Sequence, residues 1–372
     1  MRGIYIHIPF CLRKCPYCDF YSVGYDEGTA DRYIDALIRN FRQERYSGKE
    51  ADTVYLGGGT PTALSERQLE RLMSGVFESF DIKDNAEITI EANPCTADEE
   101  KLKTLRKAGI NRISFGVQSA DDGELKALGR LHDYETARRA VTDCFDAGIE
   151  NISCDIMTGL AGQEAEGLLS TAKKLTGLPV RHISAYMLKI EKGTPFDCEE
   201  VRRTVPDDDK TSTLYLALTD YLSDRGFAQY EISNYSYPGF ESRHNLKYWT
   251  GEEYAGFGAS AHSLFEGERY FVPASVKDYI GSEFQSELSE DEPYSEQEEY
   301  IMLASRLKSG LETGRLTSLY GEEKTLRLTA LAKKLEKNGL CKVSDERISL
   351  TPRGFLVSNA VILEFLSCVG LA

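Results

Sequence analysis

Three cysteines near the N-terminus have the spacing of ligands to an inorganic cluster. Cys11, Cys15 and Cys18 follow the pattern C-x3-C-x2-C in the segment after Pro9. Thiolates on one short loop can hold three corners of a cubane iron–sulfur cluster, because such clusters are bound by cysteine sulfur. A cubane has four irons, so this set leaves one iron without a cysteine. An open coordination position is typical of a working metal site rather than of a closed structural one.

Structural zinc and ordinary buried thiols are the alternatives to a cluster. His7 could be a fourth zinc ligand, but it lies on the strand side of Pro9. The paired C-x2-C units of a zinc knuckle are absent. Three cysteines within eight residues are not expected by chance in a chain that has only nine. The spacing and number of the ligands therefore favour an iron–sulfur cluster.

The cysteine segment resembles the cluster loop of the radical S-adenosylmethionine (SAM) enzymes. The cysteine pattern follows a first strand, and the aromatic Tyr17 stands before the last cysteine. The longer stretch from Tyr5 to Phe20 is similar to the oxygen-independent coproporphyrinogen III oxidases and their relatives, the HemW-type haem chaperones. The resemblance implies a 4Fe-4S cluster held by the three cysteines, with SAM chelating the open iron through its amino and carboxylate groups.

Strand and helix patterns alternate along the segment that carries these cysteines. Helical spacing of apolar residues separates six predicted strands, at 4–8, 52–56, 87–92, 112–118, 151–157 and 182–188. Such alternation predicts a parallel sheet, and right-handed connections curl it. We therefore expect an α/β fold with a partial (β/α)6 barrel of the TIM type, which the resemblance implies is a radical SAM core. Chemistry in such a fold collects at the carboxyl ends of the strands.

A triple glycine follows the second predicted strand. Glycines 57–59 precede Thr60 and Pro61, and their backbone can approach a ligand closely. The spacing G-x-G-x-x-G of a dinucleotide site is absent, and no lysine follows as in a phosphate loop. We therefore interpret the backbone of these glycines as a contact to a ligand of another kind.

Single polar residues end the next three strands. Glu91, Gln118 and Asp155 each interrupt or end an apolar run, so we expect them in one barrel mouth with the cysteine loop. Each alone could be a structural cap, but together they predict a ligand site. The family resemblance implies a fuller set of SAM contacts, namely Tyr5, Gly58, Gly59, Thr60, Glu91, Gln118, Arg130 and Asp155. Arg130 also has an alternative interpretation as a solvated charge at a helix end.

The stretch 242–249 holds the only tryptophan of the chain. Structurally it would be a loop that closes the barrel, with Trp249 as a packing anchor. Functionally, an imidazole beside tyrosine and tryptophan suits a flat macrocycle, and histidine is a common axial ligand of haem iron. Chemistry alone favours the structural interpretation. The motif His-Asn-x-x-Tyr-Trp, however, is similar to the haem-binding signature of the chaperone branch. This resemblance implies that His244, Asn245, Tyr248 and Trp249 bind haem, with His244 as the candidate iron ligand.

Composition limits the partners and the compartment. With 44 basic and 60 acidic residues the formal charge is −16, which argues against a broad basic face for nucleic acid or anionic membrane. The first strand begins at once, leaving no room for a signal peptide, and the apolar stretch 355–372 is interrupted by polar residues. Nine cysteines without a secretion signal indicate a reducing compartment. We expect a cytoplasmic protein without an integral membrane segment.

The remaining patterns predict four parts of the chain. Residues 1–235 would form the barrel, 236–280 the haem-motif region that closes it, 281–294 an acidic linker, and 295–372 a small C-terminal domain. Helices and a hairpin at 342–351 give that last domain the order of a winged helix. Its charge is close to balanced, so a structural or docking role is favoured over DNA binding.

Three functions remain open on these observations. The first is a haem chaperone that binds haem, a 4Fe-4S cluster and SAM and transfers haem to an acceptor protein. The second is an oxygen-independent coproporphyrinogen III dehydrogenase, which decarboxylates propionate side chains oxidatively. The third is a radical enzyme that acts on another substrate, such as a tRNA base. The oxidases resemble one another in an N-terminal extension and in a further cysteine two residues after the third cluster ligand. In this chain the motif begins at Tyr5 and that position is Phe20, so the chaperone is favoured over the oxidase. A tRNA-modifying enzyme should carry an added basic module, which this acidic chain lacks.

Overall fold

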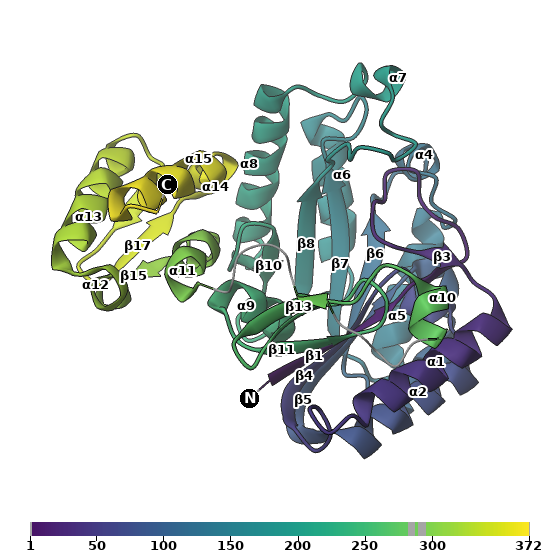
Figure 1. The fold of residues 1–372 in the computed structure, drawn as a ribbon. Coiled ribbons are helices and arrows are strands. Elements are labelled where there is room, and N and C mark those ends of the chain that lie inside the picture. The colour runs from purple at the N-terminus through teal and green to yellow at the C-terminus, as the bar shows by residue number, and fades with distance from the viewer. Residues whose placement is uncertain (1, 282–286, 289–294, 372) are drawn as a thin grey trace.

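Six parallel strands form the body of the molecule (Figure 1). The computed structural model describes residues 2–281, 287–288 and 295–371. The strands are neighbours in the order of the sequence, with parallel pairing at every step: β1 (Arg2–Ile8), β4 (Glu50–Gly58), β5 (Asp81–Ala92), β6 (Arg112–Gln118), β7 (Asn151–Thr158) and β8 (His182–Met187). The predicted incomplete α/β barrel is therefore confirmed, and the strands run beyond several of the predicted limits.

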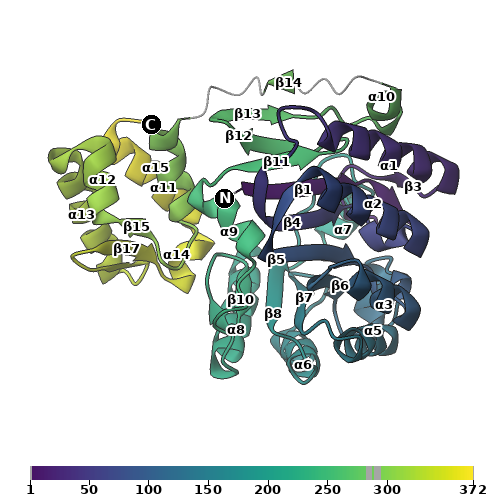
Figure 2. The ribbon, with the colours of Figure 1, turned by 90° about the horizontal axis from the view of Figure 1, so that it is seen from below.

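Helices cover the outer face of this sheet (Figure 2). They follow the strands as α1 (Glu27–Phe41), α2 (Glu66–Ser79), α3 (Glu99–Lys107), α4 (Asp122–Ala127), α5 (Tyr134–Asp146), α6 (Ala165–Thr176), α7 (Glu199–Arg202) and α8 (Asp208–Asp224). Helix α2 shows why they begin where they do: Ser65 and Gln68 form a reciprocal capping box at its first turn. Apolar side chains between helices and sheet form one large core, which fixes the positions of the strand ends.

The sheet continues past both ends of the barrel. On one side β11 (Tyr254–Phe257) pairs in parallel with β1, followed by β12 (His262–Phe265), β13 (Glu268–Phe271) and β14 (Glu287–Leu288); α10 (Val276–Gly281) follows β13 in the chain. On the other side lie β10 (Asn234–Ser236) and β9 (Ala228–Gln229). Strand β11 contains Gly256, because a Cβ at this position would overlap the carbonyl oxygen of His262.

The motif stretch is a helix, α9 (Arg243–Thr250), and the interpretation as a loop is wrong. Ser242 caps it by accepting a hydrogen bond from the amide of Asn245. The buried carboxylate of Glu87 accepts hydrogen bonds from the amides of Arg243 and His244, both at 3.1 Å. These contacts satisfy amides that a helix N-terminus leaves free. Since Glu87 lies far away in the sequence, local helix propensity could not show them.

A buried cation holds the same helix against the barrel. Lys247 is 3 % exposed, and its Nζ lies 3.0 Å from Asp52 Oδ1 and 2.9 Å from Glu252 Oε2. A buried charge needs such partners because its desolvation is costly. These ion pairs therefore fix the position of helix α9.

The C-terminal region has a core of its own. Helices α11 (Glu296–Ala304), α12 (Thr313–Tyr320), α13 (Glu322–Lys337), α14 (Pro352–Leu356) and α15 (Ser358–Val369) surround the sheet β15 (Leu311–Glu312), β17 (Arg347–Leu350) and β16 (Cys341–Val343). Strands β16 and β17 are antiparallel at the site of the expected hairpin. Helix α11 lies against α9 (Figure 1). Most of the predicted linker lies outside the described residues, and none of the described helices has the length and apolar character to cross a bilayer.

The anchor of α9 gives a first testable prediction. Glu87→Ala leaves two buried amides without an acceptor, and we expect the free energy of unfolding to fall by about 2–3 kcal/mol. Urea unfolding of the full chain measures this change. The exposed Glu50→Ala is the matched control, for which less than about 1 kcal/mol is expected. An equal loss in both variants would contradict the assignment of Glu87 as the helix anchor.

Candidate functional site

The three cysteines lie on one loop at the carboxyl end of β1. The loop runs between two short paired strands, β2 (Phe10–Cys11) and β3 (Val23–Gly24). All three thiols are free and partly exposed, and the amide of Cys18 donates to the carbonyl of Cys15 at 3.1 Å. Among the described residues no three His, Cys, Asp or Glu side chains converge on a single-ion site. Three free thiols on one short loop are the donor type that holds iron–sulfur clusters.

Arg130 turns inward onto the cysteine loop. Its Nη1 lies 3.4 Å from Cys15 Sγ and 3.4 Å from the Tyr17 hydroxyl, and its Nη2 donates to the carbonyl of Gly116 at 2.5 Å. The interpretation of Arg130 as a solvated helix-end charge is therefore wrong. Its Nε is buried and has no hydrogen-bond partner in the described part of the chain. A buried polar atom of this kind is usually satisfied, so the position suits a ligand.

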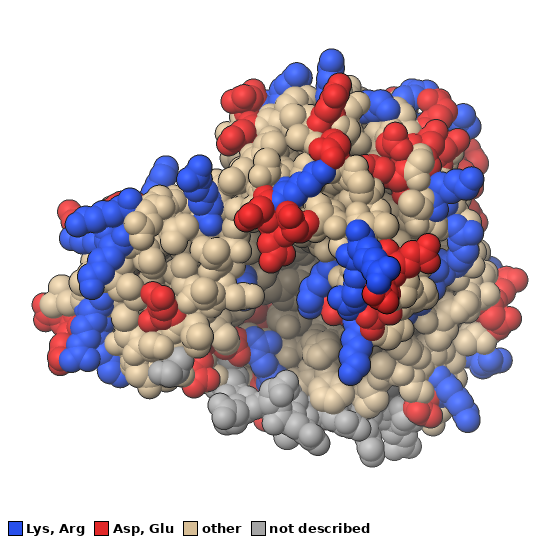
Figure 3. Space-filling model, turned by 90° about the horizontal axis from the view of Figure 1, so that it is seen from above, with Lys and Arg blue, Asp and Glu red and all other residues tan. Residues whose placement is uncertain are grey.

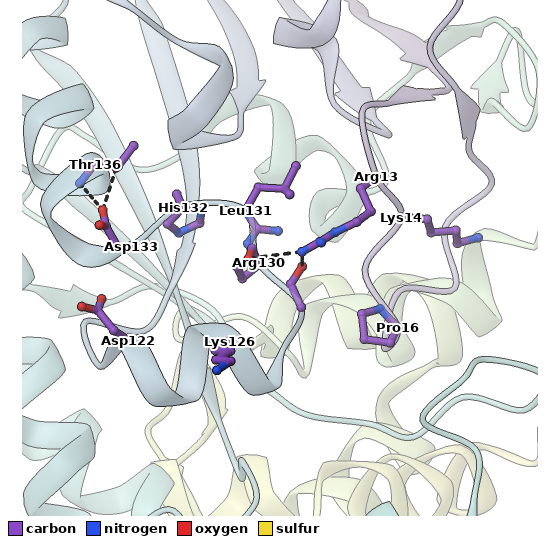
Figure 4. Close-up of a pocket in the computed structure, with 11 residues that line it drawn as sticks. Arg13, Lys14, Pro16, Asp122, Lys126, Arg130, Leu131, His132, Asp133 and Thr136 are labelled. Atoms are coloured by element: carbon purple, nitrogen blue, oxygen red, sulfur yellow. Dashed lines mark hydrogen bonds between the residues drawn. The ribbon is translucent and has the colours of Figure 1, made fainter.

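A basic hollow of about 650 Å³ opens on the outer side of the same loop (Figure 4). Arg13 reaches across it from the cysteine loop and donates to the carbonyl oxygens of Gly129 and Arg130. The turn that carries Arg130 is thereby tied to the loop that carries the thiols. The Arg13 hydrogen bonds therefore hold Arg130 and the thiols in a fixed relative position at the surface, without help from the barrel core.

The triple glycine packs against the start of the cysteine loop. Gly58 has φ +112°, and a Cβ there would lie 2.6 Å from the ring of His7. A Cβ at Gly59 would lie 2.9 Å from the carbonyl oxygen of Phe10. Only glycine fits this close approach. Thr60 Oγ1 then lies 3.5 Å from Cys11 Sγ, which brings the turn beside the first thiol.

Two carboxyl groups lie inside the mouth with raised pKa values. Glu91 accepts hydrogen bonds from the Tyr55 hydroxyl at 2.8 Å and from the amide of Gly58 at 3.1 Å. Burial, together with the charge of Asp155, raises the pKa of Glu91 to about 7. Burial also raises the pKa of Asp155 to about 6, although Ser114 donates to it at 3.3 Å. Carboxyls so perturbed are typical of ligand sites.

Gln118 is held in an unusual backbone conformation at the end of β6. Its φ is +73°, and the pairing of β6 with β7 shifts register just before it. Such strain in a non-glycine residue often marks a functional site. The side chains of Gln118 and Arg130 both lie next to Gly116. The structure thus brings the cysteine loop, the glycine turn and the strand-end polar residues to one mouth, as expected from the sequence.

A second cavity, of about 610 Å³, lies beside this mouth. Figure 3 shows that this face of the molecule is hollowed near its centre. Both edges of the curled sheet contribute to the cavity wall, together with α9 and the cysteine loop. The lining residues are Tyr5, His7, Phe20, Tyr21, Tyr55, Glu91, Tyr186, Glu231, Ser233, Asn234, Asn245, Tyr248, Trp249, Tyr254, Ser260 and His262.

The predicted haem-motif residues divide between this cavity and the protein interior. Asn245, Tyr248 and Trp249 line the cavity, whereas His244 is fully buried behind them. The His244 Nδ1 is 2.8 Å from Thr53 Oγ1 and its Nε2 is 2.9 Å from the Tyr248 hydroxyl. Burial lowers the pKa of His244 to about 3, so its imidazole is neutral. Tyr5 belongs to the same wall, with its hydroxyl 3.0 Å from His7 Nδ1.

Several cavity residues were not singled out in the sequence. Phe20 was used only as the position of a missing cysteine, yet its ring is 66 % exposed and lines the cavity. Glu231 is fully buried, one of its oxygens has no partner among the described residues, and burial raises its pKa to about 7. No local pattern marks Glu231. His262 stands in the glycine-rich segment 256–262, C-terminal to the motif.

Comparisons with known proteins agree with this arrangement. Residues 5–175 match the radical SAM superfamily model, and residues 295–357 match that of the HemN C-terminal domain. The chain is 36 % identical to heme chaperone HemW of Lactococcus lactis subsp. lactis, across 98 % of this chain and 97 % of that relative. Its identity to HemW of Bacillus subtilis is 35 %, across 98 % and 99 %. The chain belongs to the HemW family within the radical SAM superfamily.

A solved structure shares the HemW-like fold described here. Coproporphyrinogen III oxidase (HemN) of Escherichia coli superimposes with a TM-score of 0.81 over 98 % of this chain and 90 % of that one, at 21 % identity. At this identity the likeness shows the fold alone. Membership of the radical SAM superfamily implies a 4Fe-4S cluster and SAM, and the HemW relatives make the function haem-related.

The raised pKa of Glu91 predicts a pH-dependent stability. In the folded chain Glu91 keeps its proton up to about pH 7, whereas in the unfolded chain it loses it near 4.5. The contribution of Glu91 to the free energy of unfolding is thus fully present below pH 4.5. It is lost as the pH rises to 7, and the loss is on the order of 3 kcal/mol. We expect Glu91→Gln to flatten this part of the stability curve, measured by urea unfolding without cofactors. Exposed Glu50→Gln should keep the wild-type slope; an unchanged slope in Glu91→Gln would contradict the assignment.

Proposed function

We propose that this protein is a haem chaperone, which binds haem, a 4Fe-4S cluster and SAM and hands haem to an acceptor protein. The observation that carries the proposal is the aromatic cavity beside the cysteine loop, with three motif residues of α9 in its wall. Its volume of about 610 Å³ lies within the range of small-molecule and cofactor sites. We also propose that the protein works in the cytoplasm, where thiols remain reduced.

The cluster and SAM would be held at the mouth of the barrel. Cys11, Cys15 and Cys18 are the proposed ligands of three irons. When bound, such a cluster supplies an electron to SAM at the open iron. The chain's own groups would orient SAM there: backbone at Gly58, Gly59 and Thr60, and side chains of Tyr5, Glu91, Gln118, Arg130 and Asp155. The unpartnered Nε of Arg130 and the glycine cradle support this assignment.

Haem would lie in the aromatic cavity. The rings of Phe20, Tyr248 and Trp249 offer apolar faces to a flat macrocycle. Phe20 belongs to the cysteine loop, so a haem in this cavity would lie next to the cluster site. The described residues that line the cavity include two carboxyl groups and no lysine or arginine. Negatively charged propionates would therefore point out of the cavity, toward solvent.

His244 is proposed as an iron ligand on the motif resemblance. In the described conformation its Nε2 is occupied by the Tyr248 hydroxyl. Ligation by His244 therefore requires Tyr248 to turn away first. Tyr248 would thus act as a gate between the buried imidazole and the cavity.

An oxygen-independent coproporphyrinogen III dehydrogenase is the second candidate. It is favoured by one observation, the fold shared with HemN of Escherichia coli. Phe20 stands where the oxidases resemble one another in a further cysteine, and it fills part of the cavity wall with an exposed ring. We therefore rank this activity second.

Two measurements on one anaerobically reconstituted sample separate these functions. Haem titration should give saturable binding at about one haem per chain. Incubation with coproporphyrinogen III, SAM and a reductant should release neither carbon dioxide nor deoxyadenosine in step with porphyrinogen loss. Turnover of the porphyrinogen would replace the chaperone proposal with the enzyme.

The cluster ligands can be tested separately from haem. Cys15→Ala removes a proposed ligand, so iron and sulfide bound after reconstitution should fall by at least half, while haem affinity stays within about twofold. Cys198→Ala, at an exposed cysteine, is the matched control and should keep full iron content. Equal iron content in both variants would contradict the cysteine assignment.

The gate predicts opposite effects from two substitutions. Tyr248→Phe removes the hydroxyl that occupies His244 Nε2, so haem affinity should rise several-fold, whereas His244→Ala should lower it. Trp249 is the only tryptophan and lies on the same helix, so quenching of its fluorescence by haem measures both. Unchanged affinity in His244→Ala would remove this residue from the site.

A further inference from the structure

One histidine differs from the other four in its hydrogen bonding. Within residues 2–281, 287–288 and 295–371, both ring nitrogens are hydrogen-bonded in His7, His132, His182 and His244. His262 forms no such bond with the described residues, and its side chain is exposed. It lines the same cavity as Tyr248 and Trp249. It is therefore the one imidazole in that part of the chain with a nitrogen ready for a ligand.

We propose that His262 is an axial ligand of the iron of a haem bound in this cavity. This inference rests on the proposed haem-binding function and names a second histidine for it. His262 lies outside the His-Asn-x-x-Tyr-Trp motif and on a different element, the first position of β12.

The backbone of His262 is held closely in place. A Cβ at Gly256 would overlap the carbonyl oxygen of His262, so β11 and the start of β12 approach each other at a distance that glycine alone permits. The amide of Ala261 donates to the carbonyl of Gly258 at 3.0 Å and so closes the turn before it. A fixed backbone lowers the entropy that ligand binding would cost.

The ring of His262 is also oriented. It stacks on Phe271 of the neighbouring strand β13, with ring centroids 5.7 Å apart and planes at 30°. Partial burial of the ring, together with the cation of Arg269, lowers the pKa of His262, so the ring is neutral at physiological pH. A neutral imidazole is the form that binds a metal.

The position of His262 distinguishes it from His244. The sheet order places β12 near one edge of the curled sheet, whereas Glu231 and Asn234, beside the opposite edge, line the same cavity. No hydrogen bond to a described residue would have to break for the imidazole of His262 to bind an iron. His244 is reached only after the hydrogen bond to Tyr248 breaks. The two histidines thus offer a first ligand and a gated one, which suits a protein that must both hold haem and release it.

Haem titration of the full reconstituted chain tests this assignment. The variants are His262→Gln, His262→Gly and, as a control outside the cavity wall, Glu266→Gly in the turn between β12 and β13, where a positive φ of 54° suits glycine. The readouts are the dissociation constant, the Soret band and the iron–imidazole vibration of the ferrous state by resonance Raman spectroscopy. Added imidazole tests whether a free ligand replaces the missing side chain.

We expect His262→Gln to raise the dissociation constant at least tenfold and to remove the iron–imidazole vibration. Imidazole should restore the wild-type spectrum in His262→Gly, which a merely structural role would not allow. Glu266→Gly should bind as wild type does. Wild-type binding and spectra in His262→Gln would overturn the inference while leaving haem binding intact. A wild-type chain that binds no haem would instead overturn the proposed function.

Discussion

Parallel pairing of β1 on both of its edges is the constraint on which the site depends. Strand β1 lies between β4 and β11, and Tyr5 is paired with Tyr55 on one side and Gly256 on the other. Side chains alternate along a strand, so Ile4, Ile6 and Ile8 pack into the core while Tyr5 and His7 face the cavity. Pro9 then ends the strand, and the cysteine loop begins at the mouth. One strand thus positions the core, the cavity wall and the thiols.

An unclosed barrel explains why the mouth with the cysteine loop and the aromatic cavity lie side by side. A sheet that closed on itself would fill its interior with side chains. Here the edges of the sheet stay apart. Helix α9 and helix α11, the first helix of the C-terminal domain, pack together at the opening between these edges. The space that remains carries aromatic rings and two carboxyls of raised pKa, Glu91 and Glu231. Glu91 touches both places, since it bonds the glycine turn and also lines the cavity.

The parts that followed from sequence are those with local signals. Short strand-like segments separated by helical patterns predicted the six barrel strands. The polar residues that end them predicted the mouth, because parallel strands carry their carboxyl ends to one edge. The parts that did not follow depend on distant partners. Helix α9 is anchored by Glu87 and Asp52, and β11 pairs with β1 from the other end of the chain. Glycine in a sequence usually signals a turn or loop, whereas Gly256 is required by the close approach of two strands.

The same limit applies to the choice of histidine. The motif resemblance pointed to His244, and only the structure could show that both of its nitrogens are occupied and that His262 faces the cavity. Hydrogen-bond partners such as Thr53 come from other strands, so no spacing along the chain encodes them. Conversely, the cysteine spacing is local and needed no tertiary information.

The central claim is that the three thiols leave one iron open for SAM at the carboxyl end of β1. Electron paramagnetic resonance of the anaerobically reconstituted, reduced protein, recorded with and without SAM, tests it most directly. The account predicts a 4Fe-4S signal with about four irons per chain, and a clear change of its g-values when SAM is added. A signal that SAM leaves unchanged, or a protein that retains zinc in place of iron, would contradict it.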